Sequence, residues 1–173
     1  MRIRPARPDE ADPLRELIEA SIRALQANDY TPAQIEGALG TVLGLDTQLI
    51  ADGTYFVVEV DGRLAACGGW SKRRTLFGSD HGPGREDAFL DPRIDAAKIR
   101  AFFVHPDFAR QGLGTRLLEA SEQAARDAGF SRFEMGATLT GIPLYRLRGY
   151  REVERVEVPL KNGEFLGVVK MVK

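Results

Sequence analysis

The sequence predicts a single α/β domain over residues 1–173, with a mixed, mostly antiparallel sheet, one parallel βαβ crossover and about four flanking helices. Short β-rich runs are joined by the hairpin signals Asp61-Gly62 and Asn162-Gly163, which favour antiparallel neighbours. Between residues 98 and 138, an apolar strand, an amphipathic helix and a second apolar strand follow one another within about 40 residues, which is typical of a parallel pair with a right-handed crossover.

The N-terminal half alternates between helical and β periods. Residues 2–6 are predicted as a strand, and a helix follows to Leu25 because its apolar residues recur at helical spacing. A second helix begins at the capping box Thr31-Pro32-Ala33-Gln34. The runs 54–60 and 63–70 are the two strands of the first hairpin.

The C-terminal half carries the predicted crossover and a closing hairpin. Gly129 ends the crossover helix. The predicted elements are a strand at 98–104, a helix at 112–128, a strand at 131–138, a short helix at 143–148, and strands near 151–160 and 164–172. Residues 71–97 contain no periodic pattern, and a segment of that length between two strands suggests a lid over a functional site.

Composition excludes several classes of protein. With 43% hydrophobic and 28% charged residues and a net charge of −1, the chain is an ordinary globular sequence and not a general binder of nucleic acid or anionic membranes. The one cysteine, Cys67, lies in an apolar strand, so an internal disulfide is impossible and a buried structural role is expected. No segment resembles a signal peptide or membrane span, so a cytoplasmic location is expected.

A glycine-rich stretch, residues 109–115, lies where the crossover helix begins. This helix start contains no acidic residue, so its free N–H groups remain available to an external anion such as a phosphate, although a plain glycine turn has the same pattern. A dinucleotide fingerprint is excluded because Leu117 occupies the place of its third small residue, and no Gly-Lys-Ser/Thr triplet of a P-loop occurs.

The surroundings of this loop resemble the GNAT superfamily of N-acetyltransferases. The resemblance rests on the strand ending "FFVHP", the loop "ARQGLG", the helix "TRLLEASEQAARDAGF" and the later "PLYRLRGY". Gly112 and Gly114 match the family's loop motif, whereas Ala109 stands where Gln or Arg is usual. That departure removes one side chain and no backbone donor. The resemblance implies a GNAT-like sheet and acetyl-CoA as cofactor, with no metal.

The resemblance also implies where this cofactor binds. The pyrophosphate is expected on the N–H groups of the glycine loop, and the pantetheine arm is expected to pair like an extra strand with the end of strand 98–104. The residues assigned to the cofactor are Phe102, Phe103, Val104, Ala109, Arg110, Gln111, Gly112, Leu113, Gly114 and Thr115.

Tyr145 is the expected catalytic residue, because the resemblance places a tyrosine of the "PLY" stretch beside the sulfur. A phenol with a reference pKa of about 10 is able to share its proton with a departing thiolate, although a buried packing role fits the sequence equally. The general base stays open among Glu134, Asp95, Glu86, His81 and His105, because Lys98 stands where some family members carry a glutamate. Trp70 and Arg74 are predicted to bound the acceptor pocket.

These inferences predict an N-acetyltransferase that moves an acetyl group directly from acetyl-CoA to a primary amine of a small molecule or a protein. Two alternatives stay open, a non-catalytic acyl-CoA sensor and a GNAT enzyme with another acyl donor. A homodimer is compatible with the family. The sequence does not identify the acceptor.

Overall fold

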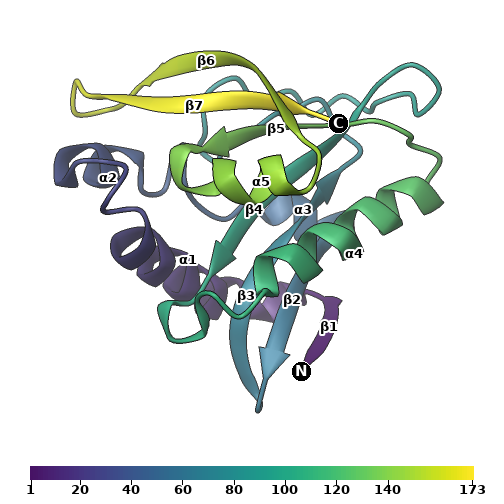
Figure 1. Ribbon diagram of the computed structural model, residues 1–173, viewed down its shortest axis with the longest axis horizontal. Helices are drawn as coiled ribbons and strands as arrows, with labels where there is room; N and C mark the ends of the chain where they lie inside the picture. Colours follow the sequence, from purple (N-terminus) through teal and green to yellow (C-terminus); the bar gives the residue numbers. More distant parts are fainter.

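A seven-stranded sheet in the order β1-β2-β3-β4-β5-β7-β6 forms the centre of the computed structural model, which describes all residues 1–173 (Figure 1). Every neighbouring pair is antiparallel except β4 and β5, which confirms the predicted mixed sheet with one parallel crossover. The strands are β1 (Arg2–Pro5), β2 (Tyr55–Val60), β3 (Arg63–Ser71), β4 (Ala97–Val104), β5 (Phe133–Thr138), β6 (Arg151–Pro159) and β7 (Phe165–Val172).

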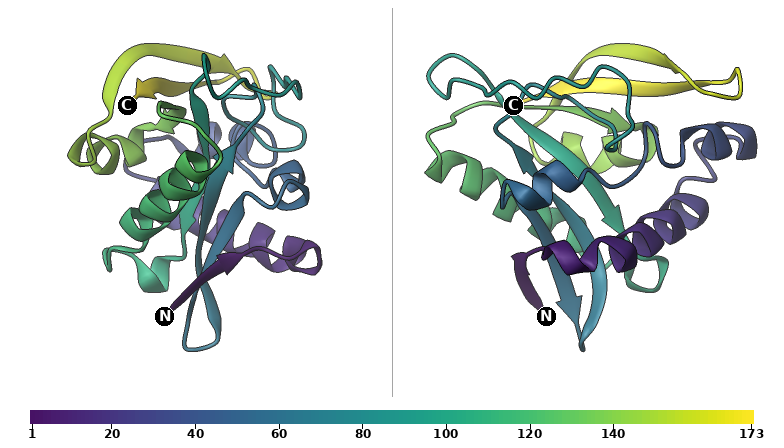
Figure 2. Two further views of the ribbon diagram at one scale, coloured as in Figure 1. Left: turned by 90° about the vertical axis from the view of Figure 1, so that its right-hand side faces the viewer. Right: turned by 180° about the vertical axis from the view of Figure 1, so that it is seen from behind.

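Helices cover both faces of the sheet (Figure 2). They are α1 (Ala11–Leu25), α2 (Pro32–Ala38), α3 (Thr47–Ala51), α4 (Leu113–Asp127) and α5 (Ile142–Leu147), with 3-10 turns η1 (Pro8–Glu10), η2 (Pro106–Phe108) and η3 (Leu139–Gly141). The sequence prediction misses α3, although the Asp46 side chain caps it by accepting a hydrogen bond from the Gln48 N–H at 3.0 Å. None of these helices combines the length and the apolar character that crossing a membrane requires.

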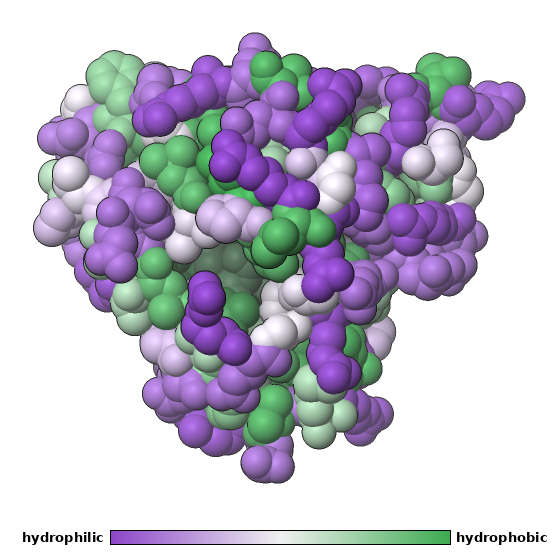
Figure 3. Space-filling view, viewed as in Figure 1, coloured by the Kyte–Doolittle hydropathy of each residue, from purple (hydrophilic) through white to green (hydrophobic).

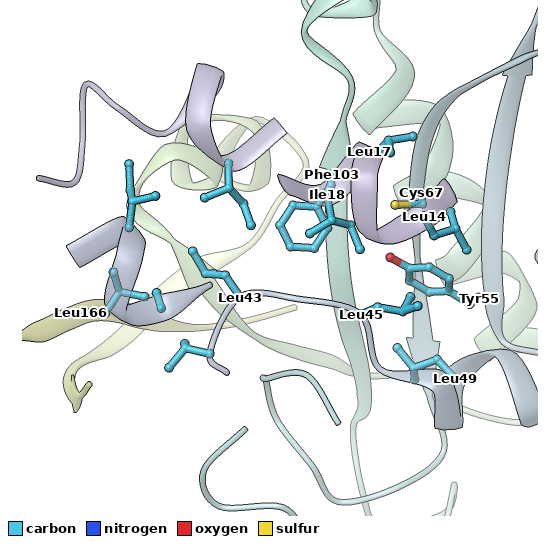
Figure 4. Packing of buried hydrophobic residues seen from close by; sticks show 14 of the residues in the cluster. Leu14, Leu17, Ile18, Leu43, Leu45, Leu49, Tyr55, Cys67, Phe103 and Leu166 are labelled. Carbon is cyan, nitrogen blue, oxygen red and sulfur yellow. The ribbon is translucent and has the colours of Figure 1, made fainter. Parts of the chain in front are cut away.

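The core on the α1 face is the largest of three buried hydrophobic clusters. One stripe of α1, including Leu14, Leu17 and Ile18, is buried against Tyr55 of β2 and neighbouring side chains of the sheet (Figure 4). Cys67 of β3 belongs to this core and is fully buried, and burial raises the pKa of its thiol to about 12. The predicted structural role of this cysteine is therefore confirmed.

Strands β4 and β5 diverge soon after they begin. They pair only at Ala97 with Phe133 and at Lys98 with Glu134, and the remainder of β4 runs away from β5 (Figure 1). The edge of residues 99–104 that faces β5 therefore has no neighbouring strand. This opening in the middle of the sheet is the feature that positions the candidate site.

A bulge in β4 lies within the divergent part. The register of β3 against β4 shifts between Cys67 and Gly69, and Ala101 adopts a φ of +57°, which is strained for a residue with a Cβ. The hydroxyl of the fully buried Tyr55 donates a hydrogen bond of 2.8 Å to the Ala101 carbonyl oxygen. This hydrogen bond from Tyr55 thus stabilises the bulge.

The Tyr55→Phe substitution tests this support. It leaves the Ala101 carbonyl without its donor, so we expect the free energy of unfolding to fall by about 1–3 kcal/mol in urea titrations. Tyr145→Phe is the matched control, because the Tyr145 hydroxyl makes no hydrogen bond within the chain and burial alone perturbs it. Equal stability of the Tyr55 variant and the wild-type protein would show that the bulge does not depend on this hydrogen bond.

Candidate active site

The glycine loop presents a row of free backbone donors. Arg110 and Gly112 have φ values of +62° and +79°, and Gly112 is the N-cap residue of α4. The N–H groups of residues 110–115 donate to no acceptor in the chain, and the first helical hydrogen bond runs from Arg116 to the Gly112 carbonyl at 3.2 Å. The first turn of α4 contains no acidic residue. This arrangement concentrates partial positive charge and suits an anion.

The two glycines of the loop have different physical roles. Gly112 needs its left-handed backbone conformation, and a Cβ there meets open space. Gly114 lies close to α5, where an added Cβ would be 3.1 Å from a methyl carbon of Leu144. The first glycine therefore shapes the turn, and the second permits α4 to approach α5.

A cavity of about 130 Å³, which we call the front cavity, begins beside this loop at Gly114 (Figure 3). Phe102, Phe103 and Val104 of β4 form one wall, and the end of α1 and the η3–α5 segment form the others. The Val104 N–H donates to the Ser21 hydroxyl at 3.2 Å. The front cavity therefore runs along the predicted cofactor strand.

Gln26 adds an unusual polar group to the front cavity. It follows the C-terminus of α1 and is 5% exposed, and its side-chain oxygen has no hydrogen-bond partner. An unpaired buried amide costs about 1–3 kcal/mol. This cost identifies the Gln26 amide as a group available to a ligand with amide or hydroxyl groups.

The opening between β4 and β5 contains a second cavity of about 60 Å³, the gap cavity. It shares Phe102, Phe103, Thr138 and Tyr145 with the front cavity. On the opposite side of the sheet, Leu43 and Gly44 also line a third cavity of about 400 Å³, the rear cavity. The three cavities therefore adjoin one another through shared lining residues, in a series from the glycine loop to the rear face that we call the path through the sheet.

Tyr145 lies where the front and gap cavities meet. Its ring packs edge to face between the rings of Phe102 and Tyr150, at centroid distances of 6.4 and 6.0 Å. An added Cβ on Gly141 would be 2.7 Å from this ring, so the turn before α5 needs a glycine. Burial raises the pKa of the Tyr145 phenol above its ordinary value, which keeps the phenol protonated at neutral pH.

Arg100 is the one charged side chain that lines the gap cavity. It is 2% exposed, and its Nη2 atom donates to Asp46 at 2.9 Å and to the Gly78 carbonyl at 2.7 Å. Its Nη1 atom donates to the Thr75 carbonyl at 3.2 Å. The Arg100 Nε is buried without any partner.

The segment 71–97 is a wall of the site and not the lid that the sequence suggests. Arg100 holds two of its carbonyl groups, and Arg85 within it pairs with Asp46 at 3.2 Å. Phe77 packs directly on Gly136 of β5, where an added Cβ would be 2.8 Å from the ring. These long-range contacts fix the segment across the gap, and no local sequence pattern reports them.

The structure does not bring Trp70 and Arg74 to this path. Trp70 is 5% exposed and packs edge to face on Phe130 at 5.7 Å, because β3 directs its side chain toward the α4 face. Arg74 lines a separate cavity of about 440 Å³, the edge cavity, at the start of β4 and β5. Neither residue lines the front, gap or rear cavity, so both lie away from the path through the sheet.

The candidate bases are also distributed over the molecule. Glu86, Asp95 and Glu134 line the edge cavity, where Glu134 forms ion pairs with Lys98 and with Lys170. Burial lowers the pKa of Lys98 to about 8. The edge cavity shares only Leu76 with the gap cavity, so no carboxylate lines the gap.

The two histidines have different positions. His105 caps η2 by accepting a hydrogen bond from the Asp107 N–H at 3.2 Å. His81 lines the rear cavity together with Asp80. Only His81 among the candidate bases therefore faces the path through the sheet.

Sequence reasoning missed three residues of the path, Ser21, Gln26 and Arg100. Ser21 is a polar residue within the apolar stripe of α1, and Arg100 is a charged residue within the apolar run "IRAFFV". A polar residue inside an apolar face is a signal of a buried polar partner or ligand. That signal was present, but it does not name the partner.

The comparisons with known proteins agree with this geometry. The family model for the acetyltransferase (GNAT) family matches residues 17–150, whereas no curated protein matches the sequence. A GCN5-related N-acetyltransferase from Rhodopseudomonas palustris has a similar structure, with a TM-score of 0.73 and 23% identity over 99% of this chain and 94% of that one.

Two further structures of similar fold contain a coenzyme. The PaiA N-acetyltransferase from Thermoplasma acidophilum, solved with coenzyme A, has a TM-score of 0.65 and 12% identity over 99% of this chain and 97% of its own. The yncA protein of Salmonella typhimurium, solved with acetyl-CoA, has a TM-score of 0.66 and 19% identity over 100% of this chain and 92% of its own. With the family model matching most of its length, this chain is an acyltransferase that belongs to the GNAT acetyltransferase family.

Proposed function

We propose that this enzyme transfers an acetyl group from acetyl-CoA directly to a primary amine. The observation that carries the proposal is the path through the sheet, which joins a row of free N–H donors to the gap cavity and Tyr145. The yncA protein, which has the same fold, was solved with acetyl-CoA, and this supports the choice of donor.

The residues present fit the pyrophosphate, the pantetheine arm and the acetyl group of acetyl-CoA. The N–H groups of residues 110–115 suit a pyrophosphate, because the helix dipole and the donors act on the same anion. The edge of Phe102–Val104 has no neighbouring strand on the β5 side and suits the extended pantetheine arm, although the Val104 N–H already donates to Ser21; the Gln26 amide lies beside it. The apolar gap cavity is large enough for the acetyl group.

When bound, acetyl-CoA supplies a thioester whose carbonyl carbon bonds to the neutral amine nitrogen while the carbon–sulfur bond breaks. Tyr145 donates its phenolic hydrogen to the leaving sulfur, and it remains protonated at neutral pH because burial raises its pKa. The amine nitrogen loses one proton as the amide forms, so the products are an acetamide and the free thiol. Since no carboxylate lines the gap, we assign the removal of that proton to solvent water, through which an equivalent proton returns to the Tyr145 phenolate and restores the phenol.

The first experiment is calorimetric titration of the protein with acetyl-CoA, with ATP and NAD as controls. Saturable binding of acetyl-CoA alone supports the cofactor assignment, and the absence of binding to folded protein contradicts it. Thiol release with a panel of amines then separates an enzyme from a non-catalytic sensor. Competition with succinyl-CoA and propionyl-CoA reports the acyl preference.

Gly112→Glu is expected to weaken this binding strongly. The substitution places a negative charge near the pyrophosphate, and unit charges about 8 Å apart repel by roughly 2 kcal/mol at an effective dielectric constant of about 20, or about 30-fold in affinity. Gly112→Gln is the control, because it introduces the same left-handed backbone strain without the charge. Equal acetyl-CoA affinities of the two variants in calorimetry would show that the pyrophosphate does not bind at the loop.

Gln26→Leu is expected to weaken acetyl-CoA binding by about tenfold, because the variant loses an amide contact with the pantetheine arm. Its thermal stability should equal or exceed that of the wild-type protein, since an unpaired buried amide is removed. Adenosine 3′,5′-bisphosphate, which lacks this arm, is the matched probe and should bind both proteins equally. If the variant loses affinity for both ligands and also loses thermal stability, the role of Gln26 is structural and not a contact with the pantetheine arm.

Tyr145→Phe is expected to lower kcat by about 10²-fold with little change in the affinity for acetyl-CoA. The raised pKa of the phenol also predicts that the wild-type pH profile shows no loss of activity from Tyr145 below about pH 10. Stopped assays of thiol release across pH measure both effects. Full turnover by the Phe variant would exclude Tyr145 as the proton donor.

A further inference from the structure

We propose that Tyr150 is a positioning residue for acetyl transfer, and that its hydrogen bond to the buried carboxylate of Glu122 fixes the ring of Tyr145 beside the gap cavity. This inference rests on the proposed role of Tyr145 as the proton donor. Tyr150 lines none of the front, gap, rear and edge cavities, so it acts through Tyr145 and not on a ligand.

Tyr145 has no hydrogen bond that fixes its hydroxyl. This group finds no partner within the chain, so its position depends on the packing of the ring and on the backbone of α5. Helix α5 has six residues, and Ile142 and Tyr145 are its buried side chains. A helix of this length is not stable by itself. Contacts from outside α5 must therefore determine where the phenol lies.

Tyr150 contacts Tyr145 through both its ring and its backbone. The two ring centroids are 6.0 Å apart, and the Tyr150 N–H donates to the Tyr145 carbonyl at 3.0 Å. Gly149, with a φ of +91°, makes the left-handed turn that returns the chain to this ring. The other ring neighbours, Phe102 and Gly141, both line the front cavity. Tyr150 is therefore the ring neighbour that lies away from these cavities.

Glu122 anchors the hydroxyl of Tyr150. It is a residue of α4 that is 4% exposed, and its Oε1 atom accepts a hydrogen bond of 2.8 Å from the Tyr150 hydroxyl. Lys173 Nζ donates to both carboxylate oxygens, at 3.1 and 3.0 Å, and Arg126 donates to Oε2 at 2.9 Å. Burial and the adjacent carboxylate raise the pKa of the Tyr150 phenol above its ordinary value, so it keeps the proton that it donates at neutral pH.

The chemistry of this cluster favours a positioning role over packing alone. Apolar side chains of similar size fill buried space at a lower cost than a carboxylate and its cations. A hydrogen bond to a charged group, however, fixes a direction as well as a distance. That property fits a tyrosine whose ring must hold a neighbouring ring in one place.

The anchor also belongs to the helix that begins at the glycine loop. Gly112 is the N-cap of α4, and Glu122 follows roughly 15 Å further along the helix axis. The proposed pyrophosphate site and the anchor of the Tyr145 ring are therefore parts of one helix. A small shift of α4 moves both together, which preserves the distance between the bound cofactor and its proton donor.

Tyr150→Phe is the direct test, because it removes the hydroxyl and keeps the ring. With an amine that supports thiol release, we expect kcat to fall about tenfold, since a displaced donor transfers its proton less efficiently. The affinity for acetyl-CoA in calorimetry should not change, because Tyr150 lines neither the front nor the gap cavity. A wild-type kcat in this variant overturns the proposal, as does an equal loss of cofactor affinity.

The same substitution in a Tyr145→Phe background separates positioning from a general structural role. The group to be positioned is absent there, so Tyr150→Phe should cause no further loss of kcat. A structural role predicts the same loss of about tenfold in both backgrounds, because the two effects are then independent. Equal losses therefore overturn the proposal.

Two further variants test the anchor. Glu122→Gln keeps an oxygen that accepts from Tyr150, so kcat should stay within about threefold of the wild-type value. Arg126→Met is the matched control, because Arg126 pairs with the same carboxylate and lies over Phe133, and its side chain is 45% exposed. Its kcat should be unchanged. A tenfold loss in either variant, about as large as that of Tyr150→Phe, overturns the assignment of the anchor.

The outcomes separate this inference from the proposed function. Reduced turnover in Tyr145→Phe together with a wild-type kcat in Tyr150→Phe overturns only the positioning role. Full turnover in Tyr145→Phe overturns the proposed proton donor, and the positioning role with it.

Discussion

The divergence of β4 from β5 is the constraint on which the candidate site depends. Two residue pairs join these strands before they separate, and their free edges then enclose the gap cavity. A continuous sheet has no such opening, because each backbone N–H and C=O is paired with a neighbour. The separation leaves an edge for an extended ligand and opens a passage between the two faces. The glycine loop and Tyr145 lie on opposite sides of this opening.

Long-range hydrogen bonds hold the opening in shape. The Tyr55 hydroxyl stabilises the strained Ala101 of the bulge by donating a hydrogen bond to its carbonyl oxygen. On the β5 side of the opening, the Tyr30 hydroxyl donates to the Gly167 carbonyl at 2.6 Å and accepts from the Leu139 N–H at 2.9 Å, which joins the connection between α1 and α2 to β7 and η3. Burial raises the pKa of Tyr30 to about 12, so this phenol keeps its proton and remains a donor at neutral pH. A buried tyrosine hydroxyl therefore stabilises each side of the opening, Tyr55 on the β4 side and Tyr30 on the β5 side.

The electrostatic pattern of the site separates anion binding from amine chemistry. Backbone groups provide the positive potential of the glycine loop, so it does not depend on a flexible side chain. Glu134 is the one carboxylate of the central strands β3, β4 and β5, and it lies in the edge cavity, where Lys98 and Lys170 neutralise it. The gap itself has one cation and one phenol in apolar surroundings. Such surroundings favour a neutral amine and a protonated tyrosine.

The sequence by itself determined the strands, the crossover, the glycine loop and the helix that carries Tyr145. Short-range patterns indicate these features. The patterns are residue periodicity, turn dihedral angles, and hydrogen bonds between neighbours such as the reciprocal pair of Thr31 and Gln34. Only the tertiary structure decided that Trp70 is a core residue, that segment 71–97 is a wall, and that Arg100 faces the gap. Arg100 and Asp46 are 54 positions apart. Because such partners meet only after the sheet has formed, periodicity and turn signals do not encode them, and the gap is a property of the fold.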